Sequence, residues 1–160
     1  MIEKPTIKEL AEFFIRGLSA GIFDTSQVAR WADSIIEKEE KPSIEIIEVC
    51  LACNRNPSDT ISCLREIKGE LQPDVSINLM AAYLLKKLMA HEMDHSNAIK
   101  LLYKASFDGA FSDLELEIMN LEESWCLVED GVYGNIEDMK KELEMFLEER
   151  REYITHLPIE

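Results

Sequence analysis

The chain has 160 residues, of which 46% are hydrophobic and 31% are charged, with only six Gly and five Pro. That balance is typical of a globular protein and excludes a disordered, linker-rich or collagen-like chain. The formal net charge of −15 repels phosphate backbones and anionic lipids, which disfavours nucleic-acid and membrane-surface partners. The start of the sequence lacks the basic and apolar regions of an export signal, and Lys86 and Lys87 interrupt its most apolar stretch, so we expect a cytoplasmic protein without a membrane span.

In the first half of the chain, apolar residues recur at helical spacing between polar residues that cap helices. Thr6-Ile-Lys-Glu9 is a capping-box pattern, in which side chain and backbone bond reciprocally at the start of a helix. Asn56-Pro57 is an N-cap followed by a proline at the first helical position. Caps and helix breakers predict four helices: from Thr6 to about Gly21, from Asp24 to the charged run at 37–41, over 43–53, and from Asn56 to about Lys68.

The second half continues the helical pattern after a predicted turn at 69–74. The helix that follows this turn is apolar around much of its circumference, so we expect it to have neighbours on more than one side. A break at 94–97 and a turn at 131–134 divide the rest. The predicted helices run from Asp74 or Ser76 to the break, from the break through Tyr103, from Ser112 to about Asp130, and from Ile136 to Ile154.

No segment shows the sustained alternation of a strand, so the fold class is all-α. We expect a single compact domain, residues 1–160, of about seven to eight antiparallel helices packed as helical hairpins, with halves 1–70 and 71–160. No fixed repeat of the helix-pair kind is evident, because the pairs lack common positions for small and aromatic residues.

Charge is unevenly distributed along the chain. Residues 1–70 hold 13 acidic and 9 basic side chains, residues 71–111 hold 4 of each, and residues 112–160 hold 15 acidic and 4 basic. Helical spacing places several of the late glutamates on shared faces, which makes them a candidate surface for a basic partner protein. A solvated helix face would show the same pattern. The candidate residues are Glu115, Glu122, Glu123, Glu129, Glu144 and Glu148.

The segment His91-Glu-Met-Asp-His95 matches H-E-x-x-H, in which two histidines on one helical face bind zinc and the glutamate polarises a water molecule. If the segment binds zinc as this motif does, it predicts a zinc-dependent hydrolase with Glu115 or Glu117 as a third ligand. Against this, Asp94 places a charge inside the motif, no strands precede it, and the histidines continue an apolar stripe that contains Leu84 and Leu88. The favoured interpretation is that these histidines are structural.

The remaining motifs indicate packing. Cys50 and Cys53 form a C-x-x-C pair without a second pair at zinc-ribbon spacing, so we expect reduced core cysteines. Trp31 and Trp125 lie on apolar helical stripes and are expected in the core. No phosphate-binding loop or nucleophile elbow is present, and the sequence predicts no cofactor.

Three stretches carry a family resemblance: residues 17–33, with Gly17-Leu-Ser-Ala-Gly21 and Trp31-Ala-Asp33, then 44–51, and 130–147. Together they resemble small all-helical immunity proteins of bacterial polymorphic toxin systems. The resemblance implies a non-enzymatic protein that binds and neutralises a cognate toxin domain, often a basic nuclease, and it makes residues 112–152 the candidate binding face. An adaptor or scaffold for another protein is the alternative within the same class, and the oligomeric state stays open.

Overall fold

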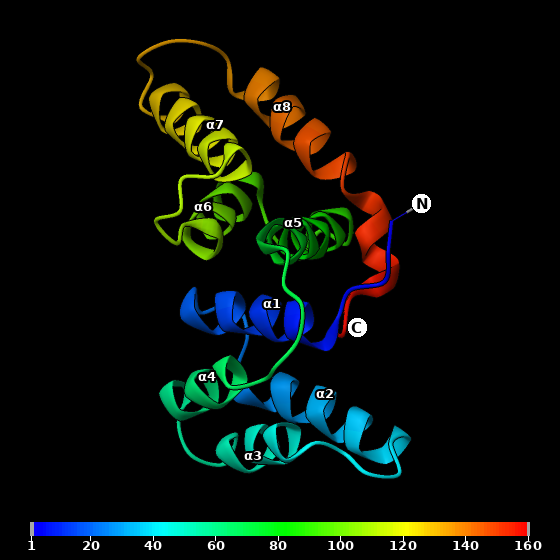
Figure 1. Ribbon diagram of the computed structural model, residues 1–160. Helices are drawn as coiled ribbons and strands as arrows, with labels where there is room; N and C mark the ends of the chain where they lie inside the picture. The colour runs from blue at the N-terminus through cyan, green and yellow to red at the C-terminus, as the bar shows by residue number, and fades with distance from the viewer. Residues whose placement is uncertain (1, 160) are drawn as a thin grey trace. The chain divides into compact units, whose positions relative to one another are not determined.

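The computed structural model describes residues 2–159, and within that range every regular element is a helix (Figure 1). The all-α prediction is therefore confirmed. Eight α-helices and one 3-10 helix follow each other along the chain. They are α1 (Ile7–Ser19), α2 (Thr25–Lys38), α3 (Ile44–Ala52), α4 (Pro57–Arg65), α5 (Pro73–Met89), α6 (His95–Ser106), α7 (Asp113–Glu129), α8 (Ile136–Glu148) and η1 (Arg151–His156).

The capping residues predicted from sequence begin these helices. The Thr6 hydroxyl accepts the backbone N–H of Glu9 at 3.1 Å, and the Glu9 carboxylate accepts the backbone N–H of Thr6 at 2.9 Å, which completes the capping box of α1. At the start of α4, the Asn56 side chain accepts the backbone N–H of Asp59, and Pro57 is the first helical residue. Five further helices begin on side-chain caps, at Asp24, Ser43, Asp94, Ser112 and Asn135.

The chain forms two compact units whose border falls inside α5. Among the described residues, the N-terminal unit holds 3–76 and 157–159, and the C-terminal unit holds 2 and 77–156. The halves predicted from the turn at 69–74 differ from these units at 71–76, because α5 starts in one unit and continues in the other. They differ also at residue 2 and residues 157–159, which belong to the opposite unit.

In the N-terminal unit, α2 packs on α3, and α4 packs on both α3 and α1. Its aromatic core joins Phe13 and Phe14 of α1 to Phe23 and to Trp31 of α2, with the Phe14 and Trp31 ring centroids 4.9 Å apart. Gly17 makes room for this cluster, because a Cβ atom there would overlap the Phe23 ring. The predicted core position of Trp31 is confirmed.

In the C-terminal unit, α6, α7 and α8 pack on one another. Large apolar side chains from three helices are fully buried here, namely Met80 and Leu84 of α5, Ile99 and Leu102 of α6, and Ile118 of α7. Trp125 of α7 is also buried, as predicted. No helix within residues 2–159 combines the length and the apolarity needed to cross a bilayer.

Three predicted helix ends were too late. The helix after the turn at 69–74 stops at Met89 rather than at the break predicted at 94–97. The fourth helix stops at Arg65 rather than near residue 68. The last α-helix stops at Glu148, and residues 151–156 form a 3-10 helix instead of extending it to Ile154. At that point the backbone N–H of Arg150 bonds to the Leu147 carbonyl, three residues back, while the Arg150 side chain takes the Phe146 carbonyl that a continuing α-helix would use.

Candidate functional site: an acidic groove

A concave surface lies in the C-terminal unit, where the end of α5, the α5–α6 turn and one side of α8 meet. It encloses about 790 Å³. Its apolar lining residues, which we call the floor, are Leu85, Leu88, Met89 and Met93, and we call its polar lining residues the rim. The rim residues are His91, Glu92, Asp94, His95, Asn97, Glu144 and Glu148. We call this surface the acidic groove.

The α5–α6 turn that forms one side of the groove is a Schellman motif. The backbone N–H of Glu92 reaches back to the Lys87 carbonyl at 3.0 Å, which closes the end of α5. His91 occupies the left-handed position of this motif, with φ of 57°. Asp94 then caps α6 by accepting the backbone N–H of Asn97 at 2.8 Å. The chain therefore leaves one helix and starts another inside the H-E-x-x-H segment.

This turn removes the geometry on which the zinc interpretation depends. His91 lies beyond the end of α5 and His95 is the first residue of α6, so the two imidazoles do not share a helical face. The Glu92 carboxylate is engaged by Lys87 at 2.7 Å. Within residues 2–159, no three His, Cys, Asp or Glu side chains are grouped to hold a metal ion. The expectation that these histidines continue the stripe of Leu84 and Leu88 was wrong for the same reason.

The same joint occurs between α1 and α2. Leu18, Ala20, Asp24 and Ser26 recur 70 residues later as Leu88, Ala90, Asp94 and Ser96. In the first joint the backbone N–H of Ile22 bonds to the Gly17 carbonyl at 2.8 Å, and the left-handed residue is Gly21. The α7–α8 joint closes in the same way, with Gly131 in the left-handed position. His91 thus stands where the two equivalent turns have glycine, a repetition that the sequence analysis missed.

Carboxylates on α8 complete the rim of the groove. Glu144 Oε1 lies 2.7 Å from His95 Nε2, which links α8 to the start of α6. Arg151 donates two hydrogen bonds to Glu148, and these lower the pKa of that carboxyl below its ordinary value. A hydrogen bond from Lys87 lowers the pKa of Glu92 likewise. Both carboxyls are therefore ionised at neutral pH, so the rim is negative.

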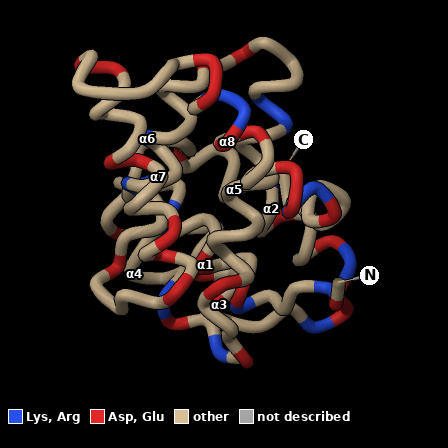
Figure 2. Tube along the Cα trace, turned by 90° about the horizontal axis from the view of Figure 1, so that it is seen from above, with Lys and Arg blue, Asp and Glu red and all other residues tan. Residues whose placement is uncertain are grey.

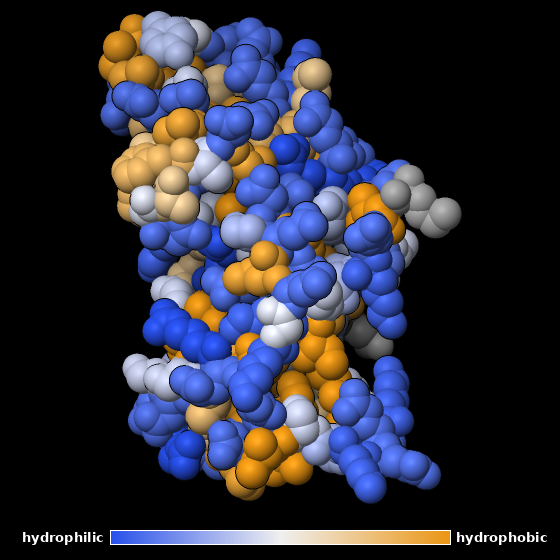
Figure 3. All heavy atoms as spheres, in the orientation of Figure 1, coloured by the Kyte–Doolittle hydropathy of each residue, from blue (hydrophilic) through white to orange (hydrophobic). Residues whose placement is uncertain are grey.

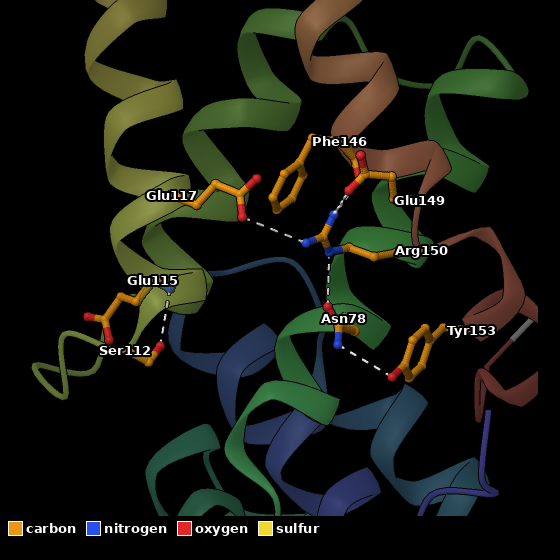
Figure 4. Close-up of polar contacts among 8 residues, drawn as sticks. All are labelled: Asn78, Ser112, Glu115, Glu117, Phe146, Glu149, Arg150 and Tyr153. Atoms are coloured by element: carbon orange, nitrogen blue, oxygen red, sulfur yellow. Dashed lines mark hydrogen bonds and ion pairs between the residues drawn. The ribbon is translucent and has the colours of Figure 1, made fainter.

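Arg150 fixes α8 beside α5 and α7 within the same unit (Figure 4). Its Nε donates to the Asn78 side-chain oxygen at 3.0 Å, and its guanidinium lies over the Phe146 ring, 3.7 Å from the ring centroid. A carboxylate oxygen of Glu117 on α7 is 4.0 Å from the guanidinium. The Asn78 amide also reaches the Tyr153 hydroxyl at 3.4 Å. This half-buried network holds the α8 wall of the groove in place.

The six carboxylates predicted as a partner surface differ in burial and in their contacts, although acidic residues recur along α7 and α8 (Figure 2). Only Glu144 and Glu148 line the groove. Glu122 and Glu123 lie on α7, half-buried and exposed respectively, and Glu122 accepts the Cys126 thiol. Including Glu115 was wrong: it is 2% exposed, and its carboxylate accepts three backbone N–H groups of the α6–α7 connection.

Glu129 is exposed but already engaged by three side chains of its own unit. It accepts hydrogen bonds from the Trp125 indole N–H at 2.5 Å, the Ser96 hydroxyl at 3.0 Å and the Lys100 ammonium at 3.2 Å. These bonds, that of Trp125 first, lower the pKa of Glu129 below its ordinary value. Glu129 thus ties α7 to α6, which is a structural role.

The cysteines are free thiols of intermediate burial rather than fully buried core residues as predicted. Cys50 donates a hydrogen bond to the Asp33 carboxylate, and this bond is the main reason that its pKa rises to about 11. Desolvation is the largest influence on Cys53 and raises the pKa of its thiol. Thiol groups with raised pKa values are poor nucleophiles at neutral pH, so the C-x-x-C pair is not poised for redox chemistry.

The chain matches no protein-family model, no curated protein and no solved structure. Its function is therefore inferred from its own residues and their geometry.

Proposed function

We propose that this chain is a protein-binding module whose acidic groove holds a basic segment of a partner, in the manner of an immunity protein that neutralises a bacterial toxin domain. The supporting observation is the combination of an apolar floor with a rim of Glu92, Asp94, Glu144 and Glu148 in one concave surface. A lysine- or arginine-bearing amphipathic segment is complementary to such a surface, because its apolar side chains cover the floor while its cations meet the rim.

Two features of the groove suit it to this role. Its methionine side chains, Met89 and Met93, are flexible and polarisable, so they adapt to the shape of an apolar anchor. Among the intramolecular partners of the rim carboxylates, Arg151 forms an exposed ion pair with Glu148, a kind of pair that contributes little to stability, while Lys87 pairs with Glu92 and His95 bonds to Glu144. A partner's guanidinium or ammonium can therefore replace Arg151 at small cost.

The family resemblance supplies the class of partner, a toxin domain, and the net charge of −15 favours a basic one. The residues that carry the resemblance in the N-terminal unit, Gly17 and Trp31, serve its aromatic core. We place the protein in the cytoplasm, where its four free cysteines stay reduced. An adaptor or scaffold would use the same groove for a different basic partner. The metallohydrolase interpretation is not supported, because the α5–α6 turn separates His91 from His95.

The test is co-expression of the chain in a bacterial host with toxin domains encoded beside its gene. Two variants carry the same change of charge: Glu144→Lys/Glu148→Lys in the groove, and Glu123→Lys/Glu142→Lys on exposed positions outside it. Both should slow association, because they weaken the long-range attraction of a basic partner. Only the groove variant should also speed dissociation and abolish protection of the host. Equal protection by both variants, or no toxin neutralised, would contradict the proposal.

A further inference from the structure

The α6–α7 connection, residues 107–112, presents phenylalanine side chains to solvent. Phe107 is 42% exposed and Phe111 is 55% exposed. With Tyr103 of α6 they form a row of rings, whose centroids are 5.8 Å apart from Tyr103 to Phe107 and 5.7 Å apart from Phe107 to Phe111. Figure 3 shows pale-orange side chains gathered on the side of the C-terminal unit where Figure 1 draws this connection. We call Tyr103, Phe107 and Phe111 the aromatic row.

The connection that carries the row is hydrogen-bonded to one buried carboxylate. The carboxylate of Glu115, itself 2% exposed, accepts the backbone N–H groups of Asp108 at 3.2 Å, Gly109 at 3.3 Å and Phe111 at 3.0 Å. Ser112 caps α7 directly after it, by accepting the backbone N–H of Glu115. A loop with three amides fixed by one buried carboxylate presents its side chains with little entropy left to lose on binding.

Phe111 is an unfavourable residue at its position for the stability of the isolated chain. Its φ of 53° lies in the left-handed region, which glycine adopts freely and phenylalanine does not. Its ring contacts Phe107 edge-on and is otherwise left largely in water, so the strain is not offset by burial. Strained residues that also expose apolar area are characteristic of binding sites.

The charge around the row selects its partner. Residues 107–117 contain four acidic side chains and no basic one; Asp113 is exposed, whereas Glu117 faces Arg150 of the same unit. This acidity repels nucleic acid and a second copy of the same negative chain. Guanidinium groups stack on aromatic faces and pair with carboxylates, a combination that lysine matches less well.

We propose that the aromatic row is a docking surface for arginine side chains of a basic protein segment, stacked on Phe107 and Phe111 and paired with Asp113. This surface is distinct from the acidic groove and does not depend on it. The row and the groove share the C-terminal unit, so a basic partner that fills one can also be held by the other.

The test is an NMR titration of the ¹⁵N-labelled full chain with the peptide acetyl-Arg-Gly-Arg-Gly-Arg-amide, and with its lysine counterpart of equal charge. We expect saturable shifts at residues 107–117, with the arginine peptide bound at least about threefold more tightly. Phe111→Gly should bring the arginine peptide to the affinity of the lysine peptide. This variant relieves the left-handed strain, so we expect it to remain folded.

A second variant separates this proposal from the groove. Glu144→Gln/Glu148→Gln removes two groove carboxylates and should leave the shifts at residues 107–117 unchanged. Equal affinity for both peptides, or shifts spread over the exposed carboxylates and insensitive to Phe111→Gly, would overturn the aromatic row as an arginine site. Either result would leave the groove untouched, since its test uses a toxin partner and different variants.

Discussion

The left-handed conformation of His91 in the α5–α6 turn can be tested by measuring the free energy of unfolding, without a binding partner. His91 adopts φ of 57° at the end of α5, whereas the equivalent residues Gly21 and Gly131 have φ of 75°. A left-handed conformation costs a non-glycine residue about 1–2 kcal/mol. Glycine loses about 0.5–1 kcal/mol more backbone entropy on folding than another residue would. His91→Gly should therefore stabilise the fold by about 0.5–1 kcal/mol.

The chain supplies matched controls for this prediction. His91 is exposed, so removing its imidazole disturbs no buried contact, and His91→Ala should keep the strain and bring no comparable gain. Gly21→Ala and Gly131→Ala should destabilise the fold, because they introduce the strain that His91→Gly removes. A Cβ atom at either glycine has no atom within 4 Å, so these changes act through the backbone alone.

Urea denaturation and thermal unfolding measure the effect. For a chain of this length, a stabilisation of about 0.5–1 kcal/mol corresponds to a rise in Tm of about 1–4 °C. If His91→Gly and His91→Ala were equally stable, the left-handed turn would be refuted and a continuous helix through the H-E-x-x-H segment would again be the better explanation. The same variant can be tested for binding. His91 lines the groove, so His91→Gly should bind the partner of the groove less tightly even though it is more stable.

Three side chains outside the turn give further tests. Arg150→Ala should lower the free energy of unfolding in urea by about 2 kcal/mol, because it removes a half-buried guanidinium network; a loss under about 0.5 kcal/mol would contradict its role in holding α8. The hydrogen bond from Trp125 to Glu129 lowers the pKa of the Glu129 carboxyl. The stabilisation from this bond is therefore fully present above pH 4.5, the ordinary pKa of a glutamate, and is lost as the pH falls through the lowered pKa. The NMR signal of the Trp125 indole should thus move only below pH 4.5. The pKa of Cys50 is raised to about 11, so at pH 8 this thiol should react with iodoacetamide at least about tenfold more slowly than a thiol of ordinary pKa. Asp33→Asn should accelerate the reaction of Cys50. An unchanged rate would count against the hydrogen bond from Cys50 to Asp33.

The helices were predictable because their starting signals are local. Thr6, Asp24 and Asn56 act on the next few backbone amides, so sequence spacing suffices to find them. Helix ends were less predictable, since they depend on tertiary partners. The last helix stops where the Arg150 side chain takes a backbone carbonyl, an event that requires the network with Asn78, 72 residues away in the chain.

The candidate site was only partly predictable for a related reason. Spacing correctly placed Glu144 and Glu148 one turn apart, but it could not show that the α5–α6 turn lies opposite them. It also could not separate exposed from structural acids. Glu115 has the spacing of a surface residue, yet it is buried by a loop whose three amides it satisfies. The signal that could have revealed this is the capping pattern of Ser112 and Glu115, which resembles that of Thr6 and Glu9.

Backbone strain links the two candidate surfaces. Among the residues that the structure describes, His91 and Phe111 are the only non-glycine residues with positive φ. One lines the acidic groove and the other ends the aromatic row, and both side chains are exposed. Selection for stability alone would favour glycine at each position, as at Gly21 and Gly131. Because neither side chain offsets its strain by burial within the chain, both positions have the character of binding sites, which is what the two proposals require of them.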